Sequence, residues 1–381
     1  MESKLAMNES DNKKVLVCPM DWGIGHASRC VPLINKLTEL GFKVVMAASG
    51  RPLEFIKKEY PGVPVIDFPG TLITYPENGW IVMKMLRLLP KLLLGIWREH
   101  VALKKIALQT NATLIISDNR YGCWHPTIPS VFMTHQLDIQ LPGGLRFAQG
   151  FLNIVNYWFI NKYDECWIPD FEPHRGLAGA LSHPPKLPLN PHYIGILSRF
   201  SGRPDPATDY TGHAFDLLVM LSGPEPQRTI LEKKILMQLV NINMQVAMVR
   251  GIPESDETYV LDQRIHVFSH LETRKMRQLI TRSDLVICRS GYSSIMDIVT
   301  LGKRAIFIPT PGQTEQEYLA RYLMEKKIYF SLKQQDFDLL YAIEMSKNYP
   351  GMIIQNDYAA LIKRITRIWV KRGEPSSEPG I

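Results

Sequence analysis

His26 follows two glycines directly after an apolar run, and its imidazole is suited to proton transfer. Residues 14–20 (KVLVCPM) are typical of a buried strand, and the turn after them contains Gly23 and Gly25. Near pH 7 an imidazole can take a proton from an attacking hydroxyl, so His26 is a candidate general base. Two alternatives stay open. Asp21 in the same turn could orient His26 or act in its place, or His26 could only cap the following helix.

Residues 284–308 predict a parallel β–α–β unit. Apolar runs at residues 284–288 and 304–308 are typical of buried strands, and residues 293–301 between them are typical of a short helix. Ligands of such sheets bind at the carboxyl ends of the strands. We therefore expect a second binding site at the turn that follows residue 288.

Small and acidic residues at this turn suit a phosphorylated sugar. The backbone N–H groups of Ser290 and Gly291, at the N-terminus of the predicted helix, can bind an anion. Asp297, which we expect in the first turn of this helix, could accept hydrogen bonds from a diol. A structural role stays open, because the patterns SxxD ending at Asp297 and TxxE ending at Glu317 both match a helix capping box.

A longer pattern extends from this turn. It consists of C-R-S-G at residues 288–291, the acid Asp297, a strand ending in Pro309, and then Gln316, Glu317 and Tyr318. The pattern resembles the nucleotide-sugar signature of family 28 glycosyltransferases, which have the GT-B fold and include MurG-type N-acetylglucosaminyltransferases. The resemblance implies that Asp297 binds the nucleotide ribose and that Gln316 contacts the donor sugar. Asp297 stands where the family has a glutamate, and Glu317 stands where it has a second glutamine.

A second turn on the donor side follows the apolar strand predicted at residues 215–221. Its sequence is SGPEP, and because proline has no N–H to give, Ser222 and Gly223 would supply most of the phosphate contacts. By the resemblance, Leu271 holds the nucleotide base through backbone groups, and Arg289 belongs to the donor-binding turn.

Polar residues also follow predicted strands in the amino-terminal half. The G-x-G-H turn at residues 23–26 resembles the family's amino-terminal loop, in which the histidine lies between donor and acceptor. Strands are predicted at residues 114–117 and 130–133, and loops that contain Asp118 and His135 follow them. These side chains could contact an acceptor, and a surface or hinge role is equally open for each.

The chain of 381 residues is long enough for two domains. We expect two Rossmann-like parallel-sheet α/β domains facing a cleft, the GT-B architecture that the resemblance implies. A polar stretch with two prolines and two glycines marks the boundary between them. The predicted parts are a disordered leader (1–13), an acceptor-binding domain (14–197), a linker (198–213), a nucleotide-sugar-binding domain (214–357), a terminal helix that packs across the junction (358–372) and a disordered tail (373–381).

No cofactor and no metal site are expected. Ser28 stands where a dinucleotide-binding turn has its third glycine, and the strand predicted at residues 43–48 does not end in an acid. The five cysteines form no C-x-x-C pair. The D-x-D triplet at residues 336–338 is better suited to open a surface helix than to bind a metal.

Residues 81–98 predict a basic amphipathic helix. Lys84, Arg87, Lys91 and Arg98 share one helical face, and the remainder is mostly apolar. Such a helix can lie on an anionic membrane surface, and the alternative is a core-packing helix with a basic solvated side. The net charge of +7 also favours an anionic partner. The scattered basic residues match no reader motif, so a nucleic acid is not expected.

By the resemblance, the predicted function is transfer of a hexose or an N-acetylhexosamine from a UDP-sugar to a hydroxyl of a lipid-linked acceptor or a cell-envelope glycan, with inversion and without a metal. The polar amino terminus lacks a secretory signal, so we expect a cytoplasmic protein, peripheral on the inner face of the membrane. The alternatives are a nucleotide-sugar hydrolase of the same fold and a non-catalytic, membrane-associated partner with a vestigial donor pocket.

Overall fold

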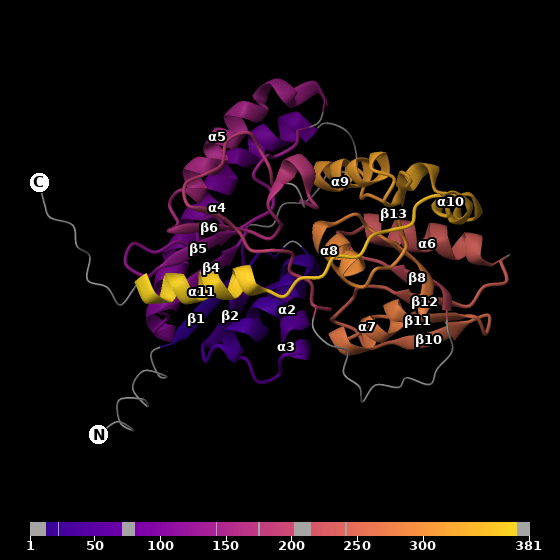
Figure 1. The fold of residues 1–381 in the computed structure, drawn as a ribbon, viewed down its shortest axis with the longest axis horizontal. Helices are drawn as coiled ribbons and strands as arrows, with labels where there is room; N and C mark the ends of the chain where they lie inside the picture. Colours follow the sequence, from indigo (N-terminus) through magenta and orange to yellow (C-terminus); the bar gives the residue numbers. More distant parts are fainter. Residues whose placement is uncertain are drawn as a thin grey trace, which may run out of the picture.

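Two seven-stranded sheets, one from each half of the chain, make up the computed structural model (Figure 1). The structure describes residues 13–21, 23–70, 81–141, 143–173, 176–201, 215–240 and 242–371. The strand order is β3-β2-β1-β4-β5-β6-β7 in the first sheet and β10-β11-β9-β8-β12-β13-β14 in the second. All pairings are parallel except that of β10 with β11 at the edge of the second sheet. The predicted fold class, two Rossmann-like parallel sheets, is confirmed.

The first sheet with its helices is called the first unit, and the second sheet with its helices the second unit. Elements of the first unit are β1 (Lys14–Pro19), α2 (Ile24–Glu39), β2 (Lys43–Ala48), α3 (Gly50–Glu59), β3 (Val65–Asp67), α4 (Ile81–Thr110), β4 (Leu114–Asp118), β5 (Ser130–Met133), α5 (Gln149–Ile160), β6 (Glu165–Ile168) and β7 (Pro191–Tyr193). Those of the second unit are β8 (Phe215–Met220), α6 (Gln227–Leu239), β9 (Val246–Val249), β10 (Thr258–Leu261), β11 (Ile265–Phe268), α7 (Thr273–Thr281), β12 (Ser283–Cys288), α8 (Tyr292–Thr300), β13 (Ala305–Phe307), α9 (Thr314–Glu325), β14 (Phe330–Ser331) and α10 (Leu339–Ser346). The last helix, α11 (Ala359–Lys371), follows them.

The central strands are apolar along most of their length because helices cover both faces of each sheet. In β1 the side chains from Val15 to Cys18 are fully buried, and in β12 those from Leu285 to Cys288 are buried as well. Parallel pairing brings the carboxyl ends of neighbouring strands to one edge. The sequence therefore builds two sheets whose ligand-binding edges are lined by loops.

Strand register decides which loops meet at each edge. In the first sheet Pro19 pairs with Asp118, and Asp118 pairs with Met133. The residues after β1, β4 and β5 therefore lie side by side. In the second sheet Cys288 pairs with both Met220 and Phe307, which brings the loops after β8, β12 and β13 together.

Two helices begin at positions that differ from the prediction. Helix α2 begins at Ile24, because Gly23 takes φ +81° and serves as its N-cap. His26 therefore lies in the first turn of α2. Helix α8 begins at Tyr292 with Gly291 as its N-cap, so Asp297 lies in the second turn and not in the first. Neither expected capping box forms, since neither α8 nor α9 has a side-chain hydrogen bond at its cap.

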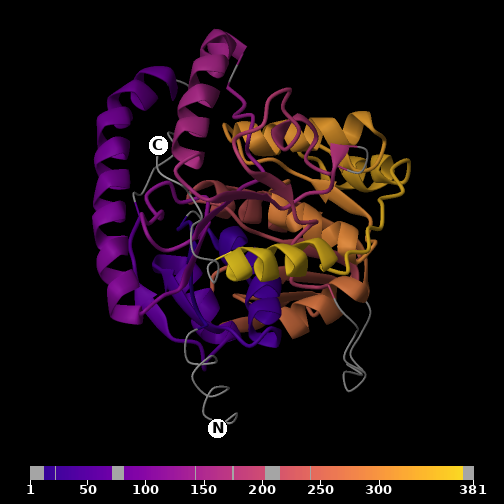
Figure 2. The ribbon, with the colours of Figure 1, turned by 60° about the vertical axis from the view of Figure 1, so that its left-hand side comes forward.

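Helices α4 and α5 run next to each other along one side of the first unit (Figures 1 and 2). Helix α4 contains Pro90 and extends ten residues beyond His100. Within the described part of the chain, no helix is long and apolar enough to cross a membrane.

The last helix returns to the first unit after the chain has crossed the second (Figure 1). On α11, Trp369 packs edge-on against Phe42, with ring centroids 5.2 Å apart, and Arg364 pairs with the buried Glu165. The chain passes between the units twice, once after β7 and once before α11, and two hydrogen bonds join these two chain crossings. Asn356 Nδ2 donates to the Ile196 carbonyl at 2.6 Å, and Tyr358 Oη donates to the Ser198 carbonyl at 2.7 Å.

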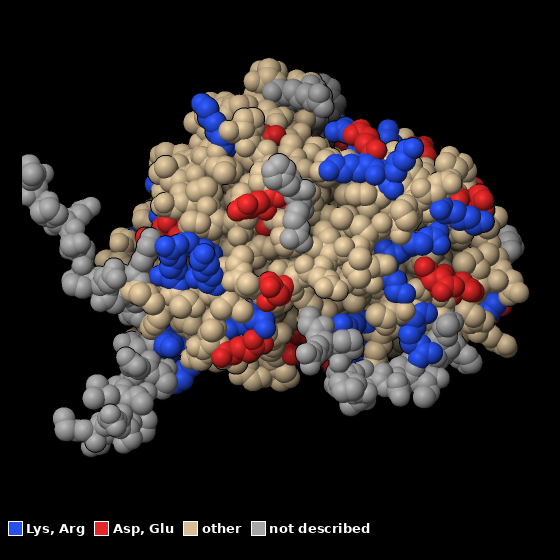
Figure 3. All heavy atoms as spheres, in the orientation of Figure 1, with Lys and Arg blue, Asp and Glu red and all other residues tan. Residues whose placement is uncertain are grey.

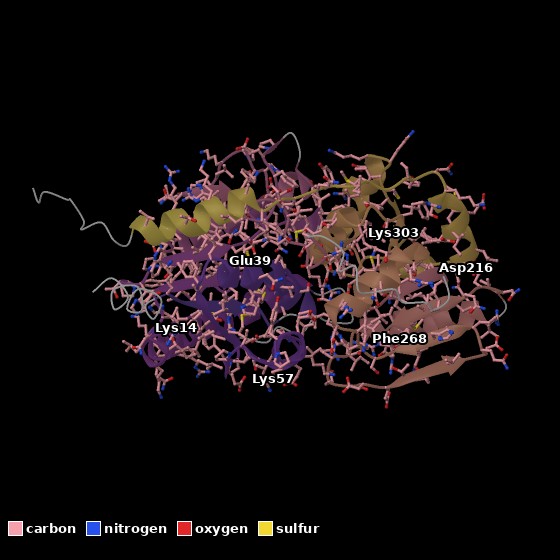
Figure 4. The ribbon with its side chains drawn as sticks, turned by 60° about the horizontal axis from the view of Figure 1, so that its bottom comes forward. Lys14, Glu39, Lys57, Asp216, Phe268 and Lys303 are labelled. Atoms are coloured by element: carbon pink, nitrogen blue, oxygen red, sulfur yellow. The ribbon has the colours of Figure 1, made fainter. Side chains whose placement is uncertain are left out.

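The two units also meet through ion pairs below the crossings. Arg51 and Lys58 of α3, the helix that carries Lys57 in Figure 4, pair with Glu254 and Asp256 in the loop after β9. On the face seen in Figure 3, Lys and Arg side chains are interspersed with Asp and Glu and form no continuous basic surface. The units therefore lie in contact, with loops of both sheets turned toward the junction.

Candidate active site

Arg29 lies at the centre of a buried polar cluster in the first unit. Its side chain is 2% exposed and donates from Nε to Asp118 Oδ2 at 2.7 Å and from Nη2 to Asp118 Oδ1. The same guanidinium lies 2.8 Å from His26 Nδ1 and 3.3 Å from His135 Nδ1. Helix α2 and the ends of β4 and β5 thus gather Asp118 and two histidines around one cation.

The cluster sets the charge of Asp118 and His26. Burial works to raise the pKa of Asp118, but the charges of Arg29 and His26 outweigh it and lower that pKa to about 2. Burial, and then the charge of Arg29, lowers the pKa of His26 below its ordinary value, while Asp118 works to raise it. Near neutral pH the site therefore holds a carboxylate beside an uncharged imidazole.

His26 has the geometry of a base supported by a carboxylate. Its Nδ1 lies 3.2 Å from Asp118 Oδ1, so an Nδ1–H directed at Asp118 leaves Nε2 free to accept a proton. Arg29 Nη2 faces the same Nδ1 and favours the opposite tautomer. The balance between Asp118 and Arg29 at this nitrogen decides whether His26 can act as a base. His26 makes no capping bond to α2, so the capping alternative is wrong.

Asp21 does not contact His26. Its carboxylate accepts from the backbone N–H of Gly70 at 2.6 Å and of Ser49 at 3.2 Å, and it lies 3.6 Å from Arg120. Burial raises the pKa of Asp21. The prediction that Asp21 orients His26 is therefore wrong, because strand order brings Asp118, at the end of β4, beside the turn.

The predicted phosphate turns meet a buried hydroxyl in the second unit. Gly223 takes φ +101°, and a Cβ on it would lie 3.4 Å from Thr310 Oγ1, which is buried and has no hydrogen-bond partner. Gln316 Oε1 accepts from Thr310 N at 2.8 Å, and its Nε2 would lie 3.8 Å from a Cβ on Gly291. Ser290 Oγ donates to the Gln316 carbonyl at 2.8 Å. The loop that follows Ser222 and the turn at Gly291 thus lie on either side of Thr310 and Gln316.

Two predicted donor-binding residues are used inside the protein. Asp297, 4% exposed, accepts from Ser198 Oγ at 2.7 Å and from Arg199 Nε at 3.3 Å, and burial raises its pKa. Arg289 is 1% exposed, and burial lowers its pKa to about 10. Its guanidinium donates to three backbone carbonyls and to the Gln334 side chain. Arg289 therefore holds loops together through both Nη atoms, while its Nε is buried without a hydrogen-bond partner, and its role in donor binding stays a prediction.

The remaining predicted donor residues have other neighbours. Glu317 Oε1 accepts from Gly312 N at 3.0 Å and so braces the loop before α9. Leu271 lies half-buried against the apolar core. Asp338 of the D-x-D triplet caps α10 by accepting from Tyr341 N at 2.8 Å, as the sequence predicted.

Residues of the second unit reach directly into the Arg29 cluster. Ser293 Oγ donates to the Gly25 carbonyl at 2.8 Å, and the Tyr292 ring stacks on His135 with centroids 4.2 Å apart. Glu315 lies 2.9 Å from His135 Nε2. Gly25 and His135, both predicted on the acceptor side, therefore contact residues of α8 and α9 in the second unit.

Arg29 and Glu315 are site residues that were not predicted from the sequence. Arg29 follows His26 by three residues, a spacing that puts both on one helical face, so the pair could have been noticed. Glu315 lies 180 positions from His135, and no local pattern announces a contact of that range.

Comparisons with known proteins agree with this architecture. Residues 227–346 match the model of the glycosyltransferase family 28 C-terminal domain. An uncharacterized glycosyltransferase of Methanosarcina acetivorans is 24% identical over 332 residues, which are 82% of this chain and 84% of that protein.

The UDP-N-acetylglucosamine--N-acetylmuramyl-(pentapeptide) pyrophosphoryl-undecaprenol N-acetylglucosamine transferase of Alcanivorax borkumensis is 25% identical over 170 residues, which are 42% of this chain and 46% of that protein. The match thus spans less than half of that relative. Among solved structures, a spinosyn forosaminyltransferase superposes with a TM-score of 0.58 at 16% identity, covering 95% of this chain and 100% of that one. The chain therefore has the GT-B fold of glycosyltransferases, and its residues 227–346 are similar to the family 28 C-terminal domain.

Proposed function

We propose that this protein transfers a sugar from a UDP-sugar to a hydroxyl of a lipid-linked or cell-envelope glycan acceptor, with inversion at the anomeric carbon. The observation that carries the proposal is the His26–Asp118 pair at the junction of the units. A hydrogen bond from Ser293 to Gly25 holds the first turn of α2, which presents His26, against the first turn of α8. A base and an anion-binding helix end therefore face the same space.

The chemistry follows from these positions. His26 Nε2 would take the proton of the acceptor hydroxyl, and Asp118 would stabilise the imidazolium that forms. The acceptor oxygen would form a bond to the anomeric carbon on the face opposite the diphosphate, while the bond from that carbon to the diphosphate oxygen breaks. This displacement inverts the configuration of the carbon.

The leaving diphosphate would be stabilised by backbone N–H groups and helix ends. Gly223 lies next to Thr310 and Gly291 next to the Gln316 side chain, and Gly291 is the N-cap of α8, whose N-terminus favours negative charge. Asp338 Oδ1 accepts from Tyr341 N as a helix cap, which supports a structural role for the D-x-D triplet. We accordingly propose a reaction that does not need a divalent cation and whose rate EDTA leaves unchanged.

The proposal of a UDP-linked donor draws on the named relative. The Alcanivorax borkumensis protein is named for a UDP-N-acetylglucosamine donor and a pyrophosphoryl-undecaprenol acceptor. The signature at residues 284–319 lies within residues 227–346, which match the family 28 C-terminal domain. A UDP-N-acetylhexosamine is therefore the first donor to test.

A lipid-linked acceptor is supported by an exposed apolar surface on α4 and the segment around α5. Trp97 is 61% exposed on α4, and Phe147, Phe151 and Trp158 are 86%, 72% and 59% exposed. On the same stretch of α4, Leu93, Leu94, Lys91 and Arg98 are also exposed, so this part is not a core-packing helix. The side chains of Lys84 and Arg87 lie outside the described residues. Apolar and cationic side chains together suit an anionic membrane surface, so we propose a peripheral position there.

The proposal is tested by incubating the purified protein with UDP-sugars, with and without an undecaprenyl-pyrophosphoryl glycan. Transfer that requires the acceptor, with an inverted anomeric configuration by NMR, is the expected result. Rapid release of free sugar without an acceptor would favour the nucleotide-sugar hydrolase. Tight donor binding with no turnover on any lipid or glycan extract would favour the non-catalytic partner.

A further inference from the structure

Glu315 is the acidic residue of the second unit that contacts His135, next to the support of His26. It lies in the first turn of α9, and its Oε1 is 2.9 Å from His135 Nε2. Its Oε2 accepts from the Gln136 amide. The His135 side chain is 4% exposed and that of Glu315 is 28% exposed, so the contact is largely shielded from water.

The hydrogen-bonding chemistry of Arg29 fixes the tautomer of His135. A guanidinium can only donate, so His135 Nδ1, which lies 3.3 Å from Arg29 Nη1, must accept. The ring proton is then on Nε2, which faces Glu315 and donates to it. His135 therefore links a carboxylate of the second unit to the guanidinium that holds Asp118.

A continuous set of contacts thus runs from α9 to the base. Glu315 orients His135, His135 accepts from Arg29, and Arg29 contacts both Asp118 and His26 Nδ1. Because Arg29 and Asp118 compete for that nitrogen, the position of the guanidinium determines how well His26 is prepared to accept a proton. The orientation of His135 in turn restrains the guanidinium.

We propose that Glu315 is a positioning residue for the transfer reaction, which prepares His26 as a base when α9 lies against the first unit. The proposal rests on the proposed function in taking His26 as the base. Glu315 then acts through His135 and Arg29, without touching the acceptor hydroxyl. It gives a reason for a carboxylate of the donor-side helix to point into the acceptor-side cluster.

The sign of the electrostatic effect can be worked out. The charged or titratable groups that face His26 are Arg29 on its own helix, Asp118 at the end of β4, His135 after β5 and Glu315 on α9. Burial and Arg29 lower the pKa of His26, whereas Asp118 and Glu315 raise it. Removing the charge of Glu315 should therefore lower the pKa of His26.

The first test is the pH profile of kcat/KM for the full-length protein and its Glu315→Gln variant. A general base is active when deprotonated, so activity falls as the pH drops below the pKa of His26. With Gln at this position, the acidic limb should move to lower pH by about 0.5 unit, since a charge beyond direct contact shifts a pKa less than a direct partner does. The matched control is Glu325→Gln, an exposed acid at the other end of α9, which should leave the profile unchanged.

A second variant separates positioning from direct contact with the sugar. His135→Asn removes the link and leaves the charge of Glu315, so kcat should fall about tenfold or more while the KM for the donor stays the same. The double variant, His135→Asn with Glu315→Gln, should lose little more kcat than the single variant with the larger loss. A raised donor KM for Glu315→Gln with an unmoved acidic limb would overturn the proposal and make Glu315 a sugar ligand. A loss of kcat at every pH with the limb unmoved would make it merely structural.

An NMR titration of the His26 C2–H signal decides the matter independently of turnover. The His26 signal is the one that is absent from the spectrum of His26→Gln. The pKa of His26 is then compared between the unaltered protein and Glu315→Gln. A lower pKa in the variant supports the proposal even if no acceptor is ever found. An unchanged pKa in a folded variant overturns it, whatever the outcome for sugar transfer.

Discussion

Ser293 Oγ donates to the carbonyl of Gly25 at 2.8 Å, across 268 positions of sequence. The bond joins the first turn of α2 to the first turn of α8, so the turn with the candidate base and the turn with the candidate phosphate amides form one structure. A Cβ on Gly25 would lie 3.4 Å from Ser293 Oγ, at van der Waals contact, so the two turns lie close together here. The contact that holds the two units close together therefore lies at the place where we propose that the chemistry occurs.

Replacing His26 by Ala should remove the base and spare the donor site. Turnover should fall by about 10²–10⁴, the usual contribution of a general base, while the Kd for the donor stays the same. Steady-state kinetics and calorimetric titration measure the two quantities. His125→Ala, in a loop of the first unit outside the cluster, is the matched control and should retain full turnover. A loss below about tenfold would exclude His26 as the base.

Asp118 should make the protein sensitive to acid. Its pKa is lowered from 3.8 to about 2 in the folded protein, so its contribution to stability is present above pH 4 and is lost as the pH falls toward 2. The contribution is about 2 kcal/mol in the free energy of unfolding, from a shift of roughly two units. Urea unfolding between pH 5 and pH 2 should show this loss in the unaltered protein. The loss should be absent in Asp118→Asn and intact in the exposed-site control Asp284→Asn.

Asp297 should be needed mainly for stability. Its carboxylate accepts hydrogen bonds from Ser198 and Arg199, and all three side chains are buried or nearly so. Asp297→Ala should lower the free energy of unfolding by about 1–3 kcal/mol, the cost of leaving buried donors without partners. Thermal melting with and without a UDP-sugar measures stability and donor binding together. A large loss of donor affinity at an unchanged Tm would instead support the ribose-binding role that the family resemblance implies.

The exposed surface of α4 should bind anionic lipid. Replacing Lys91 and Arg98 by Gln removes two exposed charges, each worth about 1 kcal/mol near such a surface, so vesicle affinity should fall about 30-fold at low salt. Co-sedimentation with anionic vesicles measures this. The matched control removes Lys233 and Lys347, two exposed charges of the second unit, and should sediment like the unaltered protein. Equal sedimentation of all three forms would leave the lipid-linked acceptor without structural support.

Local patterns in the sequence were enough to predict most of the elements. The strands at residues 43–48 and 130–133 have the predicted bounds, because short apolar runs between polar turns are a strong signal for buried strands. Helix starts were less predictable. The start of α2 depends on the positive φ of Gly23, which places His26 inside the helix and not in the turn before it.

The partners of the site residues could not be predicted in the same way. Asp21 lies near His26 in sequence, but Asp118 is its neighbour in space, because β4 pairs with β1 in the sheet. Strand order is a long-range property that one sequence does not reveal. Arg289 and Asp297 matched a ligand-binding pattern, yet their contacts with Gln334 and Ser198 depend on how distant loops pack.

The return of α11 to the first unit has a mechanical consequence. The second unit is attached by two chain crossings, and Asn356 and Tyr358 on one are hydrogen-bonded to Ile196 and Ser198 on the other. Because these two connections are hydrogen-bonded to each other, we expect movement of the second unit relative to the first to be a rotation about this one place. Opening for substrate entry and closing for transfer would then follow a single arc, which returns Ser293 to Gly25 and Glu315 to His135 in the same alignment at every turnover.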